Sequence, residues 1–121
     1  MTSPKLPLRS AVSAGGFVFV SGQLGFGADG QLVGDGISAQ AHQTLENIKL
    51  VLSDNGARLS DVVKVNIWLT TKSDFIEFNK VYASYFADGK FPSRSTVLSQ
   101  LLIDGARVEI DAVAYVGQRT V

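Results

Sequence analysis

Residues 61–70 constrain the fold more than any other stretch of this sequence, because their side chains alternate strictly along the segment. A β-strand places successive side chains on opposite faces. One face of this predicted strand is therefore apolar throughout and consists of Val63, Val65, Ile67 and Leu69. The opposite face also carries two large apolar side chains, Val62 and Trp68. A sheet that contains this strand needs cover on both faces.

Two segments show helical periodicity. In the first, about 38–55, apolar residues recur every three or four positions, and Gly56 is a typical C-terminal stop. That stripe is Ala41, Leu45, Ile48 and Leu52. The second helix is predicted over about 74–86, where Asp74 and Glu77 have the spacing of a capping pair. Its predicted buried stripe is Phe75, Phe78, Tyr82, Tyr85 and Phe86.

The remaining extended segments complete the order of elements. Phe-Val-Phe-Val at 17–20 reads as a strand buried on both faces, paired through a Gly15–Gly16 turn with 11–13. Asp29–Gly30 is typical of a hairpin turn. Two closing strands are predicted, at 94–99 and 107–116. The resulting order is β-β-α-β-α-β-β.

This order predicts an α+β protein with a mixed sheet, in a single domain spanning residues 1–121. Two helices can cover only one face of such a sheet. The other face carries Val62 and Trp68, and a second copy of the chain is the simplest cover for it. We therefore expect an oligomer.

Composition excludes several classes of function. Eleven Lys and Arg balance eleven Asp and Glu, which argues against a nucleic-acid partner. No apolar run is long enough to span a membrane, and residues 1–10 lack the apolar core of a secretory signal. Cysteine is absent, which excludes thiolate metal sites and cysteine nucleophiles. We expect a cytoplasmic protein without membrane contact.

The common cofactor, metal and nucleophile motifs are either absent or lack the structural context that they need. Residues 25–30 match G-x-G-x-x-G, but an extended patch follows them where a dinucleotide site needs a helix N-terminus. His42 is the only histidine and has no second histidine or cysteine to share a metal. No G-x-S-x-G string exists for a serine nucleophile. We expect neither a cofactor nor a metal.

Two charged residues on the closing strands are candidates for chemistry. Arg94 shares a face with Thr96, and Glu109 lies between apolar neighbours on the last strand. Arg94 either forms an ion pair with a nearby carboxylate or offers its paired donors to a ligand carboxylate. Glu109 is either a salt-bridge partner of Arg107 or Lys64 or a functional group. The residues alone leave both alternatives open.

Several strings together resemble the RidA/YjgF family of enamine and imine deaminases, from about residue 7 to near the end of the chain. They lie at 11–23, 40–49, 61–64, 74–82, 91–97 and 108–114. The most specific are Phe-Pro-Ser-Arg-Ser-Thr-Val at 91–97 and the final strand at 108–114.

This resemblance implies a chorismate-mutase-like α+β fold assembled as a homotrimer, with ligand pockets in clefts between subunits. It also implies hydrolysis of 2-aminoacrylate and of imines such as iminopropanoate and iminobutanoate to 2-oxo acids and ammonia, without cofactor or metal. Such a role belongs to the control of metabolite damage.

The resemblance also assigns site residues. Arg94 would hold the substrate carboxylate, and Glu109 would orient the attacking water or exchange protons with the leaving nitrogen. Ser21 and Gly22 correspond to pocket positions through their backbone, and Asn79 through its side chain. Thr96 stands where many members carry cysteine, so that thiol-based switching is excluded here.

One departure from the family pattern lies at the N-terminus. Leu8 stands where active members usually have tyrosine, and Arg9 adds a cation near the same mouth. Besides an active deaminase, two alternatives remain: a non-catalytic or sensory member that binds 2-oxo acids, and a deaminase of a related catabolic enamine such as an aminomuconate. A ribonuclease finds little support in the balanced charge and the single histidine.

Overall fold

The computed structural model of the chain describes residues 6–34 and 36–117. Its strands and α-helices follow one another in the predicted order. They are β1 Ala11–Ala14, β2 Phe17–Gln23, α1 Ile37–Asp54, β3 Val62–Leu69, α2 Phe75–Ala83, β4 Ser93–Leu98 and β5 Val108–Tyr115. The predicted domain span of 1–121 and the N-terminal stretch 1–10 include residues outside this description.

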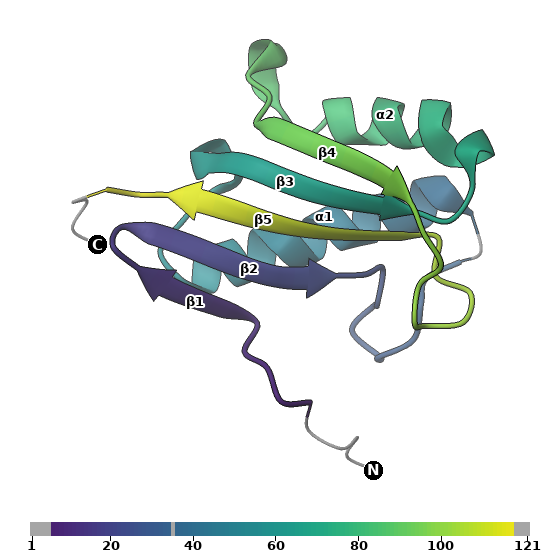
Figure 1. Cartoon of the computed structure of the whole chain (residues 1–121), viewed down its shortest axis with the longest axis horizontal. Helices are drawn as coiled ribbons and strands as arrows, with labels where there is room; N and C mark the ends of the chain where they lie inside the picture. The colour runs from purple at the N-terminus through teal and green to yellow at the C-terminus, as the bar shows by residue number, and fades with distance from the viewer. Residues whose placement is uncertain (1–5, 35, 118–121) are drawn as a thin grey trace.

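The strands form one five-stranded sheet in the order β1-β2-β5-β3-β4. Only the β3–β4 pair is parallel; β1–β2, β2–β5 and β3–β5 are antiparallel. Figure 1 shows both helices on the same side of this sheet. The predicted α+β fold, with a mixed sheet and two helices on one face, is confirmed.

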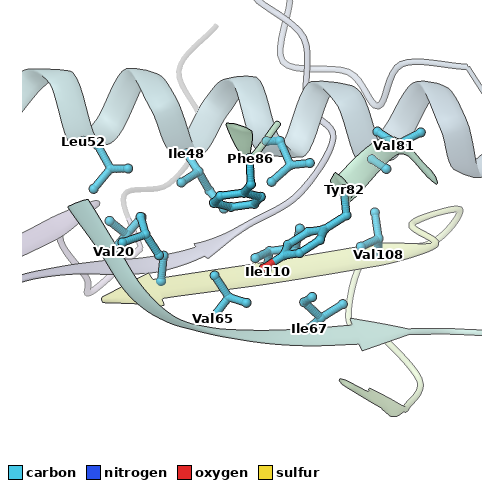
Figure 2. Close-up of a cluster of buried hydrophobic side chains, with 14 of the residues drawn as sticks. Val20, Ile48, Leu52, Val65, Ile67, Val81, Tyr82, Phe86, Val108 and Ile110 are labelled. Atoms are coloured by element: carbon cyan, nitrogen blue, oxygen red, sulfur yellow. The ribbon is translucent and has the colours of Figure 1, made fainter. Parts of the chain in front are cut away.

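The hydrophobic core lies between that sheet face and the helices. All four apolar residues of the predicted α1 stripe are buried there. Tyr82 and Phe86 reach into the core from α2 and the turn that follows it, as Figure 2 shows. No helix in the described part of the chain combines the length and the apolar character needed to cross a bilayer.

The opposite face of the sheet is bare in the single chain, and this corrects the prediction for β2. Val18 and Val20 are buried under the helices, but Phe17 and Phe19 are 37% and 45% exposed. Phe17 packs on Tyr115 of β5, with ring centroids 4.8 Å apart. The prediction that 17–20 is buried on both faces is therefore wrong for one chain, because both helices lie on the other side.

A β-bulge corrects the predicted faces of β3. Val65, Ile67 and Leu69 face the core as predicted, but Val62 is buried while Val63 is 47% exposed. The pairing register with β5 shifts between Val62 and Lys64. An extra residue in one strand inverts the alternation on one side of the bulge, so Val62 and Val63 exchange their predicted faces.

Helix α2 is shorter than predicted and begins differently. It ends at Ala83, and Phe75 of the predicted buried stripe is 45% exposed. The predicted capping pair is wrong, because Asp74 caps no backbone N–H of the helix with its side chain. Glu77 instead accepts a hydrogen bond from Ser38 of α1 at 2.6 Å.

Asp74 is used for a buried ion pair instead. It is 4% exposed and receives two hydrogen bonds from the Arg107 guanidinium, at 2.9 Å from Nε and 2.7 Å from Nη2. The fully buried Gln40 of α1 binds the same segment, because its Oε1 accepts from the Arg107 backbone N–H at 2.8 Å. These contacts join the start of α2 to α1 and to the residue before β5.

We expect Asp74→Ala to lower the free energy of unfolding, because it removes the carboxylate that faces the Arg107 guanidinium. The loss should be about 2–3 kcal/mol, below the range of fully buried pairs because the Arg107 side chain is 35% exposed. Urea unfolding at fixed protein concentration measures it. Lys49→Ala, which removes an exposed pair with Glu46, is the matched control and should cost less than about 0.5 kcal/mol. Equal losses in both variants would contradict the assignment.

Candidate active site

Arg94 lies on the edge strand β4 with its side chain held against α2. Its Nε donates to Thr96 Oγ1 at 2.9 Å, and its Nη2 donates to Asn79 Oδ1 at 2.7 Å. A guanidinium carries five N–H donors in a planar fork. Two of these five N–H groups therefore hold the side chain in place, and others remain to bind a planar anion.

Aromatic rings form the wall behind this guanidinium. Its central carbon lies 4.9 Å from the Tyr82 ring centroid, 5.6 Å from that of Phe78 and 5.8 Å from that of Phe75. Burial lowers the pKa of Arg94 from its ordinary value, although an arginine stays charged in proteins. The rings therefore attract the cation and exclude water from one side of it.

No carboxylate among the described residues forms an ion pair with Arg94. Among the described residues, the only salt bridges join Lys49 to Glu46 and Arg107 to Asp74. A cavity of about 300 Å³ borders the Arg94 side chain instead, lined by Asn79, Tyr82, Ala83, Phe91 and Pro92. Arg94 thus presents a cation beside open space, which favours the ligand alternative.

Glu109 lies on β5 against the backbone of Gly22 in β2. A methyl group at position 22 would collide with Glu109 Oε2, so only glycine leaves the carboxylate in this place. The β2–β5 register shifts between Val20 and Gln23. This bulge turns the Ser21–Gly22 segment toward the carboxylate.

The surroundings of Glu109 favour the protonated form of its carboxyl group. Burial raises the pKa of this carboxyl, and the negative charge of Asp111 on the same face of β5 raises it further. The predicted alternative of a salt bridge from Arg107 is wrong, because that guanidinium binds Asp74. A carboxylate with a raised pKa is a stronger base than an ordinary carboxylate, which suits a group that exchanges protons.

Ser21, which precedes Gly22, is held by two hydrogen bonds to the residues before β1. Its hydroxyl donates to the backbone carbonyl of Arg9 at 2.6 Å, and its backbone N–H donates to the Ser10 carbonyl at 2.9 Å. These bonds extend the β1–β2 pairing toward the N-terminus. Residues 9 and 10 are thereby placed beside Ser21 and Gly22.

Arg94 and Glu109 occupy opposite faces of the sheet. Arg94 pairs with Val65 of β3, which faces the helices, whereas Glu109 pairs with Trp68, on the bare face. Residues paired across strands point to the same side. The predicted site residues therefore form two half-sites. The guanidinium half-site is Arg94, Asn79 and Thr96, and the carboxylate half-site is Ser21, Gly22 and Glu109.

The aromatic support of the guanidinium half-site was not predicted from the sequence. Helical periodicity predicts Phe75, Phe78 and Tyr82 as part of a core stripe, but these three rings also contact Arg94. The sequence contained one indication of this contact, because the candidate pocket residue Asn79 lies on the same helix as these three rings. His42 lies on the exposed side of α1 and contacts the Tyr85 hydroxyl at 3.1 Å. Within residues 6–34 and 36–117, no three acidic or histidine side chains cluster as metal ligands do.

Comparisons with known proteins place this fold in one class. The structure superposes on the crystal structure of RidA from an Antarctic Psychrobacter species with a TM-score of 0.85 and 38% identity, covering 93% of this chain and 91% of that one. A Rid family protein of unknown function from Yersinia pestis gives a TM-score of 0.88 at 37% identity, covering 94% and 91%. These are α+β proteins of the RidA/YjgF type.

Sequence comparison gives the same result. Residues 2–116 match the family model described as Endoribonuclease L-PSP. The 2-iminobutanoate/2-iminopropanoate deaminase of Bos taurus is 39% identical over 115 residues, which are 94% of this chain and 83% of that protein. This chain belongs to the RidA/YjgF family, and its relatives include proteins named as imine deaminases.

We expect Asp111→Asn to lower the pKa of Glu109, because it removes the neighbouring negative charge that raises it. Titration of the Glu109 side-chain carboxyl by NMR measures the change. Asp104→Asn, in the exposed loop before β5, is the control and should leave the titration unchanged. A Glu109 titration that is the same in the Asp111 variant and wild type would mean that burial alone sets this pKa.

Proposed function

We propose that this protein hydrolyses 2-imino acids, and their enamine tautomers, to 2-oxo acids and ammonia. The substrates are of the 2-aminoacrylate, iminopropanoate and iminobutanoate type. The observation that carries the proposal is Arg94, a desolvated guanidinium with unused donors beside a cavity and with no carboxylate partner among the described residues. The names of the relatives support the same reaction.

In this proposal, Arg94 binds the carboxylate common to all 2-imino acids. Two parallel N–H donors match the two carboxylate oxygens and fix the orientation of the adjacent imine carbon. Asn79 and Thr96 position the guanidinium, and the aromatic wall strengthens its attraction for an anion by excluding water. Binding in one orientation supplies part of the rate enhancement.

Glu109 acts on water and on the departing nitrogen. It accepts a proton from water as the water oxygen bonds to the imine carbon, and it returns a proton to the nitrogen. Glu109 then transfers the hydroxyl proton of the tetrahedral adduct to its nitrogen. The C–N bond breaks, ammonia leaves, and the carbon keeps the oxygen as a carbonyl. A raised pKa suits a group that both takes and gives a proton.

The complete site needs two copies of the chain. Arg94 and Glu109 cannot meet across their own sheet, so we infer that the guanidinium half-site of one copy faces the carboxylate half-site of another. The bare sheet face supports such contact, because Phe17, Phe19, Val97 and Tyr115 are each more than a third exposed there. A heterologous contact closes into a ring when the rotation between neighbouring copies allows it, and the ring that we propose is a homotrimer.

An imine-trapping assay tests the reaction. An amino-acid dehydratase generates 2-aminoacrylate or iminobutanoate, semicarbazide traps the imine, and the protein should suppress the trapped product. Arg94→Ala and Glu109→Ala should each abolish suppression. If wild type behaves like the blank but binds 2-oxobutanoate through Arg94 in calorimetry, the protein is a 2-oxo-acid binder and not an enzyme.

Mixing the two inactive variants tests the shared site. A random mixture of Arg94→Ala and Glu109→Ala chains, refolded together, should regain about a quarter of the sites, because one interface in four then combines an intact arginine with an intact glutamate. Each variant refolded alone is the control. If the mixture is no more active than the separate variants, both residues of a site come from one chain.

Trp68 tests the assembly. It lies on the bare face beside Glu109 in the β3–β5 register, so we expect Trp68→Ala to weaken subunit association. Light scattering across a dilution series should show dissociation at a higher protein concentration than for wild type. An unchanged oligomer would place Trp68 outside the contact.

A further inference from the structure

We propose that Asn66 is a positioning residue for the proposed reaction, because its side-chain amide holds the Asp111 carboxylate in one place beside Glu109. This inference rests on the proposed function and concerns the carboxylate half-site. In it, Glu109 exchanges protons with water and with the departing nitrogen. Asp111 acts on Glu109 through its negative charge, and Asn66 acts through Asp111.

The sheet register brings these three residues to one face. In the β3–β5 pairing, Asn66 lies opposite Asp111. Two residues farther along β3, Trp68 lies opposite Glu109. Residues paired across strands, and residues two apart along one strand, point to the same side of a sheet. Asn66 and Asp111 are therefore on the bare face with Glu109, and each of the three is partly buried in the single chain.

A hydrogen bond between side chains joins Asn66 to Asp111. Asn66 Nδ2 donates to Asp111 Oδ1 at 3.0 Å, in a partly buried position. A hydrogen bond to an ionised carboxylate is stronger than one between two neutral groups. This bond restricts the rotation of the Asp111 side chain. The carboxylate is therefore held at one place relative to Glu109.

The place of this charge matters for the basicity of Glu109. Burial raises the pKa of Glu109 most, and the negative charge of Asp111 raises it further. The energy of two charges depends on their separation and on the solvent between them. A carboxylate free to turn into water would act on Glu109 less strongly. The hydrogen bond from Asn66 thus helps to keep Glu109 a stronger base than an ordinary carboxylate.

The other charged groups near this pair are few. Of the two strands beside β5, β2 contains no charged residue and β3 contains only Lys64. Lys64 pairs with Val113, two residues beyond Asp111, and neither of the two salt bridges among the described residues includes it. A released Asp111 carboxylate would be free to turn toward Lys64 or toward water, and either movement weakens its effect on Glu109. In the proposed assembly, Arg94 of another copy also faces Glu109, and its charge is the same in every variant below.

NMR titration of the Glu109 carboxyl tests the coupling of the three residues. Asn66→Ala should lower the pKa of Glu109 by about 0.3–0.5 pH units, as for the partial loss of one nearby charge. In the Asp111→Asn background, Asn66→Ala should cause no further change. Asn55→Ala, which removes an amide donor to the Val51 carbonyl at the end of α1, is the matched control and should leave the titration unchanged. No change in Asn66→Ala, or the same change in both backgrounds, would overturn the proposal.

The pH dependence of kcat/KM, measured against the blank at each pH, tests the consequence for the reaction. A general base acts only when deprotonated, so the acid limb of the profile follows its pKa. The acid limb should move to lower pH in Asn66→Ala, and in Asn66→Val if the alanine variant does not fold. Asn66→Thr, which keeps a hydroxyl donor, should lie closer to wild type. A rate that falls equally at every pH, with the limb unmoved, would show a structural role only and would overturn the proposal.

The titration needs no turnover, which separates this inference from the proposed reaction. If wild type hydrolyses no imine but Asn66→Ala lowers the pKa of Glu109 only while Asp111 is present, the proposed reaction fails and the coupling stands. If wild type is active but Asn66→Ala leaves both the titration and the acid limb unchanged, only the role of Asn66 fails.

Discussion

The alternation of side chains along β5 is the constraint on which the rest of this structure depends. β5 lies between β2 and β3, and its apolar residues Val108, Ile110, Ala112 and Ala114 are buried under the helices. A strand with one face in the core must direct the intervening residues to the other face. Glu109 is therefore placed on the bare face without burying a charge in the core. The position of this carboxylate is a consequence of core packing.

The guanidinium half-site depends on a different part of the fold. Arg94 comes from the edge strand β4, and α2 supplies its hydrogen-bond acceptor Asn79 and the rings behind it. The position of α2 is fixed in turn by the ion pair between Asp74 and Arg107, two residues before Glu109. One contact thus connects the helix that holds the guanidinium to the strand that carries the carboxylate, although the two groups face opposite sides of the sheet.

This separation connects assembly to chemistry. The chain exposes aromatic residues on one sheet face and carries half of the proposed site on each face. Both features favour association with copies of itself. In the assembly that we propose, burial of the apolar surface would supply the free energy, and the same contact would bring a cation to a carboxylate.

The sequence by itself determined the order of elements, the α1 stripe and the family, because these follow from local periodicity and from strings such as Phe-Pro-Ser-Arg at 91–94. It also gave the candidate residues of both half-sites. Only the tertiary structure decided the partners of Asp74, which binds Arg107 across 33 residues and caps no helix. Likewise, only the sheet register placed Arg94 and Glu109 on opposite faces. Periodicity records which residues of one segment share a face, but the face on which two distant segments align is set by their pairing and by bulges.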